Sequence, residues 1–275
     1  MKLFFRKLGQ GPPLIILHGL YGSSDNWLGI ARALSARFTI YLIDQRNHGH
    51  SPHDPVNTYQ AMRDDLRDFM DGHDIWKTNL VGHSMGGKTA MFFAAAYPHR
   101  LISLVVVDIS PRSYKSLSGP SPQVLMHMNI IHSLRSLDLE HLSGRTQAEE
   151  MLAETVPSRR VRQFLLKSLD RDREGRYRWR LNLDALANQL PAIMDGFSPE
   201  VVKKGMRITG FSVLFIRGEQ SDYLQEEDIT FASELFPSAV FSTIQGAGHW
   251  VHAEQPERFL EVIEKFYDNS SESSS

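Results

Sequence analysis

The feature of this sequence that most constrains its fold is a run of seven residues, Leu101 to Val107, made almost entirely of Leu, Ile and Val. A strand of this composition is buried on both faces, which is typical of a parallel sheet covered by helices on both sides. Apolar runs of the same kind alternate with stretches of helical spacing along the chain, at residues 14–17, 38–43, 79–82, 212–217 and 240–244. This alternation predicts an α/β fold with a mostly parallel sheet flanked by helices.

The alternation stops between residues 113 and 207, where we find only helix-like stretches and charge-rich turns. The charged cluster at 170–176 is interpreted as one of these solvated turns. We therefore expect one core, residues 1–112 and 208–268, with a helical cap, residues 113–207, inserted after the strand that ends at Asp108. The Ser- and Glu-rich residues 269–275 are expected to be a disordered tail.

Composition excludes several classes of protein. The chain of 275 residues has a formal net charge of −2, which argues against a nucleic-acid partner and a polybasic membrane-surface binder. It has no Cys, so disulfides, Cys-ligated zinc and a Cys nucleophile are excluded. The loop with His48, His50 and His53 lacks the spacing of metal ligands, and we expect no metal. With no signal-peptide pattern and no apolar run long enough to span a bilayer, we expect a cytoplasmic protein without stable membrane insertion.

The turn between an expected strand and an expected helix carries a candidate nucleophile. Residues 82–86 read Gly-His-Ser-Met-Gly, which fits G-x-S-x-G with Ser84 at its centre. Small residues on both sides let the strand and the helix approach closely, so that a serine hydroxyl projects above the sheet. The helix that follows presents free N–H groups and the positive end of its dipole.

A serine hydroxyl needs a base, and the best candidate among the 12 histidines is His249. It follows the last expected strand on a loop with glycines, and the chain order of Ser84 before His249 fits that of a hydrolase. His252 is the competitor, although it is expected to begin the turn into the last helix. His83 is expected to pack beside the serine turn.

Negative charge that develops on a substrate oxygen needs N–H donors in fixed positions. Met85, directly after Ser84, supplies one. The second is expected from the loop after the strand at 14–17, and the N–H of Leu20 is our choice. The preceding His18 and Gly19 form the tight turn that would aim it.

With these motifs assembled, the chain resembles the α/β-hydrolase superfamily along nearly its whole length. The segments that carry the resemblance are 18–27, 44–51, 82–88, 106–111 and 246–254. They are similar to one branch in particular, which holds small bacterial esterases and the mitochondrial abhydrolase-domain protein eleven. The resemblance implies the α/β-hydrolase fold, a helical lid at 113–207 and hydrolysis of carboxylic esters or thioesters, including acyl-CoA.

The carboxylate that orients the histidine is the least determined member of the site. The superfamily commonly has G-x-x-D after the strand at 212–216, but here Ser221 stands where Asp is expected. The branch that this chain resembles also has Ser there, with Asp in V-D-I-[AS]-P, which implies Asp108 as the acid. Ser221 is expected to assist by a hydrogen bond to His249 or Asp108. Catalytic groups of open α/β sheets collect at such strand ends. Asp222 and Asp184 remain alternatives, and Asp184 is otherwise expected to hold the lid in place.

These residues predict a cofactor-free serine hydrolase that forms an acyl-enzyme on Ser84, acts on a small-molecule acyl ester or thioester and works as a monomer or homodimer. C–C bond hydrolysis, lyase or cofactor-free oxygenase chemistry, and a non-catalytic binding protein, are the alternatives. Lys88 is expected on the helix surface or paired with an acid, rather than bound to a substrate anion. Most apolar side chains of the lid are expected in its core and a minority along an acyl pocket, among them Leu125, Met126, Met128, Ile130, Ile131 and Phe164.

Overall fold

A seven-stranded sheet forms the centre of the computed structural model, which describes residues 1–114 and 120–272, with side chains as far as Asn269. The strand order is β1-β3-β2-β4-β5-β8-β9, and every neighbouring pair is parallel except β1 with β3. In chain order the strands are β1 (Phe5–Leu8), β2 (Pro13–Leu17), β3 (Thr39–Ile43), β4 (Thr78–His83), β5 (Leu101–Val107), β8 (Ser212–Gly218) and β9 (Ala239–Ile244). The predicted fold class and the six expected apolar strands are therefore confirmed.

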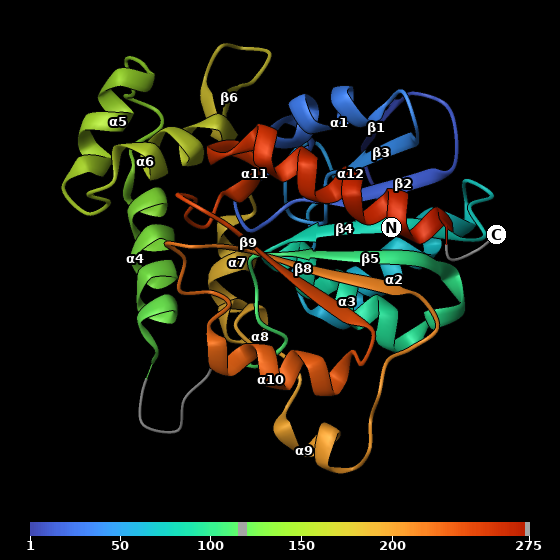
Figure 1. The fold of residues 1–275 in the computed structure, drawn as a ribbon. Coiled ribbons are helices and arrows are strands. Elements are labelled where there is room, and N and C mark those ends of the chain that lie inside the picture. The colour runs from blue at the N-terminus through green and yellow to red at the C-terminus, as the bar shows by residue number, and fades with distance from the viewer. Residues whose placement is uncertain (115–119, 273–275) are drawn as a thin grey trace.

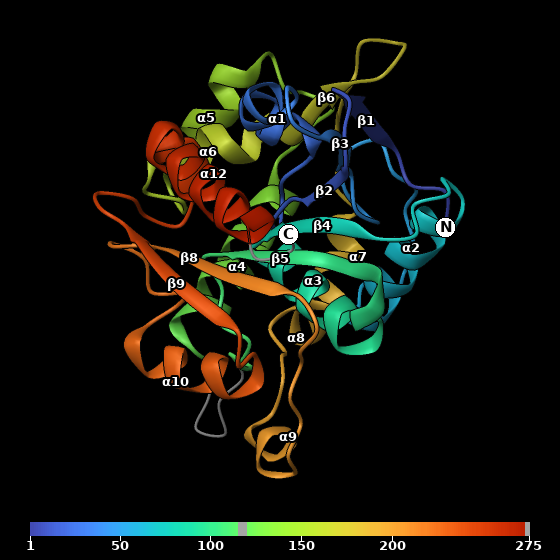
Figure 2. The ribbon, with the colours of Figure 1, turned by 45° about the vertical axis from the view of Figure 1, so that its right-hand side comes forward.

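Helices cover both faces of this sheet (Figures 1 and 2). Trp27, Leu34 and Phe259 belong to the apolar cluster that joins α1 and α12 to one face, whereas Phe69, Phe93 and Phe231 belong to the cluster under α2, α3 and α10 on the other. Burial of both faces explains why β5 is continuously apolar. The helical elements of the core are η1 (Ser24–Trp27), α1 (Leu28–Leu34), α2 (Tyr59–Asp71), α3 (Met85–Ala96), η2 (Pro98–Arg100), α10 (Glu226–Leu235), α11 (Val251–Glu254) and α12 (Pro256–Glu272).

The insertion between β5 and β8 forms the cap, whose helices α4, α5 and α6 stand together beyond one end of the sheet (Figure 1). A separate apolar cluster, with Leu134, Leu152 and Leu186 at its centre, holds these helices together. The elements of the insertion are α4 (Pro122–Ser136), α5 (Arg145–Ala153), α6 (Arg159–Leu165), η3 (Leu166–Ser168), β6 (Leu169–Arg171), β7 (Tyr177–Trp179), α7 (Leu183–Asn188), α8 (Leu190–Ile193) and α9 (Pro199–Lys203).

Three expectations about the insertion and the C-terminal tail were wrong in detail. The insertion is not purely helical, because β6 and β7 pair as an antiparallel hairpin around the charged turn at 172–176. Phe197 and Val202 pack in the apolar cluster of the core, so the last part of segment 113–207 does not belong to the cap by packing. Helix α12 continues through Glu272, so the expected disordered tail begins too early at Asn269; residues 273–275 lie outside the described residues.

Lys88 is buried, so the expectation that places it on the helix surface was wrong. Its ammonium group donates hydrogen bonds to the carbonyl oxygens of Arg112 and Asp195, both at 2.5 Å, and lies over the ring of Tyr114. These two carbonyls lie where the chain leaves the core and where it returns from the cap. Lys88 on α3 therefore joins the two ends of the cap to the core.

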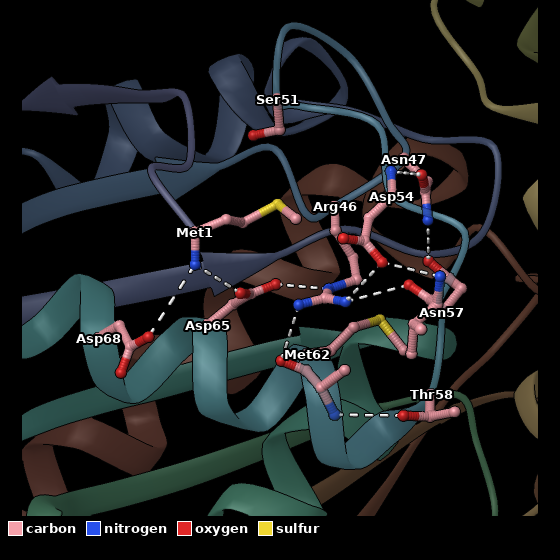
Figure 3. Close-up of polar contacts among 12 residues, drawn as sticks. Met1, Arg46, Asn47, Ser51, Asp54, Asn57, Thr58, Met62, Asp65 and Asp68 are labelled. Carbon is pink, nitrogen blue, oxygen red and sulfur yellow. Dashed lines mark hydrogen bonds and ion pairs between the residues drawn. The ribbon is translucent and has the colours of Figure 1, made fainter.

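A second attachment of the cap lies on the loop after β3. Arg46 is held between Asp65 of α2, at 2.6 Å, and Asp54, at 3.6 Å, which fixes the loop (Figure 3). The neighbouring Asn47 is buried with a φ of 67° and accepts two hydrogen bonds from Asn182 of the cap, both at 3.0 Å. This ordered loop therefore supports the end of the hairpin that leads into α7. No helix in the described part of the chain is long and apolar enough to cross a membrane.

Candidate active site

Ser84 lies in a strained turn between β4 and α3, with φ 52° and ψ −118°. The turn depends on glycines, because a Cβ at Gly82 would come within 2.3 Å of the Gly86 carbonyl oxygen and one at Gly86 within 2.4 Å of the Leu17 carbonyl oxygen. A non-glycine residue with positive φ costs on the order of 1–3 kcal/mol and persists only where the surrounding structure imposes it. Here close packing of α3 on β2 imposes it, and the serine is raised above the end of the sheet.

The structure brings His249 to this serine from the loop after β9. The Ser84 hydroxyl lies 3.0 Å from Nε2 of His249, and Nδ1 of His249 lies 2.7 Å from the Asp108 carboxylate. The ring is stacked on Tyr223, with centroids 3.9 Å apart. The His249 carbonyl oxygen accepts a hydrogen bond from Nε2 of His83 at 2.8 Å, so His83 supports the backbone of His249 rather than contacting the serine. Side chain and backbone of His249 are thus both held.

Asp108 is fully buried at the end of β5 with a φ of 51°. Its carboxylate accepts a hydrogen bond from the N–H of Gly218 at 2.9 Å and another from the hydroxyl of Ser221. The structure therefore places Asp108 beside His249 and Ser221 beside Asp108. Asp222 is exposed, and Asp184 is paired with Arg135 at 2.9 Å on the surface of the cap. Neither alternative acid contacts the histidine.

The loop after β2, which contains Leu20, lies against the serine turn. Gly19 approaches it so closely that a Cβ there would lie 3.1 Å from Cβ of Ser84. His18 fixes this loop, since Nδ1 donates to the Gly19 carbonyl at 2.8 Å and Nε2 accepts the N–H of Gln45 at 3.0 Å. No hydrogen bond from the N–H of Leu20 or Met85 to another described residue is seen. Both donors are thus available to a ligand.

The other histidines near the site are buried and uncharged. Burial lowers the pKa of His18 and of His83, in the latter case together with the neighbouring His249, and it lowers the pKa of His48 and of His252 to about 3. His252 is stacked on Trp27 and takes no part in the contacts of Ser84. Within residues 1–114 and 120–272, no group of three or more His, Asp or Glu side chains is placed to hold a metal ion.

A largely apolar cavity of about 140 Å³ opens above Ser84 between the core and the cap. None of the described residues that line it is Asp, Glu, Lys or Arg. The lining consists of Gly19, Leu20, Tyr21, His83, Ser84, Met126, His127, Ile130, Val161, Phe164, Leu165, Tyr223, His249 and Trp250.

The expected division of the apolar lid residues was only partly right. Met126, Ile130 and Phe164 line the cavity and Ile131 is buried in the cap, but Leu125 and Met128 are exposed on α4.

Sequence reasoning missed Glu254, whose carboxylate accepts the N–H of Gly248 at 3.0 Å and that of Trp250 at 3.3 Å. It therefore fixes the backbone on both sides of His249. From the cap, Arg160 pairs with Glu254 at 2.7 Å. The segment 246–254 contained the signal, because its likeness to a family segment extends to this glutamate, but spacing alone does not reveal what the carboxylate binds.

Sequence reasoning also missed three aromatic residues of the cavity wall. Tyr21 follows Leu20, His127 lies on α4, and Tyr223 lies two residues after Ser221. No local pattern marks them, because they meet only when the cap folds over the core.

Fold and contacts together define a class, namely α/β proteins with a hydrogen-bonded serine, histidine and aspartate at the carboxyl ends of parallel strands. A family model described as alpha/beta hydrolase fold matches residues 12–256, and the chain belongs to this family.

Relatives and a solved structure are similar over most of their length. The sn-1-specific diacylglycerol lipase ABHD11 of Danio rerio is 38% identical, with 94% of this chain and 79% of the relative covered. Esterase YbfF of Escherichia coli is 36% identical over 94% of this chain and 93% of its own. The solved structure of a marine microorganism esterase superposes with a TM-score of 0.89 at 43% identity, over 96% of this chain and 99% of that one.

Proposed function

We propose that this chain is a serine hydrolase that cleaves carboxylic esters through an acyl-enzyme on Ser84. The observation that carries the proposal is the unbroken line of contacts from the buried Asp108 through His249 to the Ser84 hydroxyl at the floor of an apolar cavity. The family and the esterases and lipase among its relatives support the same reaction class.

In the first half of the reaction, the Ser84 oxygen attacks the ester carbonyl carbon while Nε2 of His249 takes the hydroxyl proton. The Asp108 carboxylate accepts a hydrogen bond from the Nδ1–H of His249, which holds the ring in this tautomer and stabilises the imidazolium. Collapse of the tetrahedral intermediate breaks the bond to the leaving oxygen, to which His249 gives its proton. Water then attacks the acyl-enzyme with the same histidine as base, and the acid is released with Ser84 restored.

The N–H groups of Leu20 and Met85 bind the oxygen that becomes negative in both tetrahedral intermediates. Leu20 lies on the loop that His18 holds, and Met85 lies in the first turn of α3, so both donors belong to fixed elements. Donors fixed in advance need no reorganisation when charge develops, and removal of one such donor typically costs about 10²–10³ in turnover.

The cavity suits an uncharged acyl group of short to medium length, because its described lining has no Asp, Glu, Lys or Arg side chain. The same steps apply to a thioester, including acyl-CoA, whose sulfur leaves as a thiol. We expect the enzyme to act as a monomer or homodimer, and the cytoplasmic location also stays a prediction.

Hydrolysis of p-nitrophenyl butyrate by the purified chain, with Ser84→Ala as control, tests the proposal. We expect steady release of butyrate that falls by several orders of magnitude in Ser84→Ala. Rates for esters of different acyl chain length, compared with the acyl-CoA compounds of the same length, show whether the preferred leaving group is an alcohol or CoA. Full hydrolysis by Ser84→Ala would contradict the acyl-enzyme on Ser84. No hydrolysis of any ester in the panel would contradict the reaction class and favour the C–C hydrolase, lyase or oxygenase alternatives.

A further inference from the structure

A buried histidine of the cap connects two tyrosines on opposite sides of the reacting residues. Nδ1 of His127 lies 3.2 Å from the hydroxyl oxygen of Tyr21, and Nε2 lies 3.1 Å from that of Tyr223. Tyr21 follows the proposed oxyanion donor Leu20, while Tyr223 is stacked on His249. All three side chains line the largely apolar cavity.

These three groups hold one more proton than their mutual hydrogen bonds use. Burial keeps His127 neutral, with its pKa lowered to about 3, so the imidazole carries one N–H and each tyrosine one O–H. Two hydrogen bonds use two of the three protons. One hydroxyl proton is left over whichever tautomer is present.

The tautomer decides where the spare proton lies. With the proton on Nδ1 of His127, Tyr223 donates to Nε2, and the only acceptor among the described residues for the Tyr21 hydroxyl is the His127 carbonyl at 3.4 Å. With the proton on Nε2, Tyr21 donates to Nδ1 and the hydroxyl proton of Tyr223 has no acceptor among the described residues. The first tautomer thus leaves the spare hydroxyl with one long hydrogen bond, and the second leaves it without an acceptor, which costs about 1–3 kcal/mol; a ligand oxygen would improve both.

The backbone of Tyr21 gives independent support. Its φ of 64° lies in the left-handed region, which is rare for a bulky aromatic residue and costs on the order of 1–3 kcal/mol. Such strain collects at ligand-binding and catalytic sites. At Tyr21 this backbone conformation turns the side chain toward His127 of the cap.

We infer that Tyr21, His127 and Tyr223 form a subsite that binds a second, uncharged oxygen atom of the ester substrate, such as an ether, hydroxyl or carbonyl oxygen. The subsite supplies a hydroxyl donor and neutral acceptors, and the described cavity lining has no side chain with a full charge to balance an ionic group. The inference rests on the proposed function and narrows it to esters that carry another oxygen beyond the reacting group.

Matched substrates that differ by one atom test the subsite. In one pair the oxygen is in the alcohol part, 2-methoxyethyl butyrate against butyl butyrate. In the other it is in the acyl part, ethyl 4-methoxybutanoate against ethyl hexanoate. The measured quantity is the ratio of kcat/KM between the members of a pair, compared between wild type and variant so that the intrinsic reactivity of each ester cancels.

We expect the double variant Tyr21→Phe/Tyr223→Phe to lower this ratio about five- to tenfold for at least one pair, as expected for the loss of one neutral hydrogen bond. The phenylalanine rings keep the stacking on His249 and the packing of the cap. Tyr59→Phe is the control, because the Tyr59 hydroxyl also bonds the cap, at the Ile193 carbonyl, but lies outside the cavity lining.

An unchanged ratio for both pairs, or an equal fall in Tyr59→Phe, would overturn the inference and leave the three residues as a latch between cap and core. Hydrolysis of the alkyl esters by wild type in the same experiment shows that the proposed function stands even if the subsite fails. If wild type hydrolyses none of the four esters, the proposed function itself fails.

Discussion

The core and the cap build different parts of one site in different ways. The core supplies Ser84, Asp108 and His249 from the ends of β4, β5 and β9, and two of them are held at positive φ by the packing of the sheet and α3. The cap supplies side chains from α4 and α6 that enclose the cavity. The proposed reacting atoms therefore sit on a strained backbone at the end of the sheet, and the side chains proposed to select the substrate sit on a separate layer above it.

The substitution with the largest expected effect tests whether the carboxylate that orients His249 comes from the core or from the cap. Asp108→Asn should lower kcat for p-nitrophenyl butyrate by about four orders of magnitude, because the amide stabilises the wrong histidine tautomer and no longer balances the imidazolium. Exposed Asp222→Asn and the cap variant Asp184→Asn should stay within about twofold. If only Asp222→Asn is inactive, the acid has been assigned to the wrong residue.

The next effect concerns stability at acid pH. Burial lowers the pKa of His48, His127 and His252 to about 3, whereas the unfolded chain binds a proton near pH 6.5. Above pH 6.5 these histidines are neutral in the folded and the unfolded chain and do not change the free energy of unfolding. As the pH falls from 6.5 toward 3, only the unfolded chain binds the protons, and the free energy of unfolding decreases. Because each proton changes the free energy of unfolding by about 1.4 kcal/mol per pH unit, these three histidines alone should cause a loss of about 4 kcal/mol near pH 5.5, measured by urea denaturation.

The same titration separates cap from core. His127→Phe should reduce the slope by about 1.4 kcal/mol per pH unit, and replacement of the exposed His132 on the same helix should leave it unchanged. A free energy of unfolding that is constant between pH 7.5 and 5 would contradict the buried, neutral state of these histidines.

The attachment of the cap should depend on Lys88. Lys88→Met removes the ammonium donor from the carbonyls of Arg112 and Asp195, which should lower the free energy of unfolding by about 2–3 kcal/mol. Urea denaturation measures the change, and the exposed Lys77→Met is the matched control. A loss below about 0.5 kcal/mol would mean that the cap is held mainly by its apolar contacts.

The smallest effect concerns the contact between cap and histidine loop. Glu254→Gln weakens the acceptor for the N–H groups of Gly248 and Trp250, so the position of His249 is less well fixed. We expect kcat to fall about tenfold while KM stays within twofold. Arg160→Gln removes only the partner from the cap and should cost less. Equal losses in both variants would assign the effect to the position of the cap, and unchanged kcat in Glu254→Gln would remove Glu254 from the site.

The core could be predicted closely because its signals are local. Apolar runs mark strands buried on both faces, and glycines mark the turns that carry Ser84 and His249. Asp108 needed the family resemblance, because which carboxylate reaches the histidine depends on how β5 and β8 lie side by side.

The cap was predicted less well because its contacts join distant segments. Strands β6 and β7 have three residues each, too few for a periodic pattern, and they flank a charged turn. Lys88 looked like a surface residue because helical spacing does not show that two cap ends cover α3. The hydrogen bond between Tyr21 and His127 spans 106 residues of sequence and exists only once the cap has folded onto the core.

The central claim, that Ser84 is the nucleophile and His249 activates it, is tested most directly by covalent labelling with a fluorophosphonate. Mass spectrometry of the wild-type protein should show one adduct per chain on the peptide that contains Ser84. Labelling should be absent in Ser84→Ala and slowed by several orders of magnitude in His249→Ala. An adduct on another residue, or ester hydrolysis by a protein that cannot be labelled, would contradict the account.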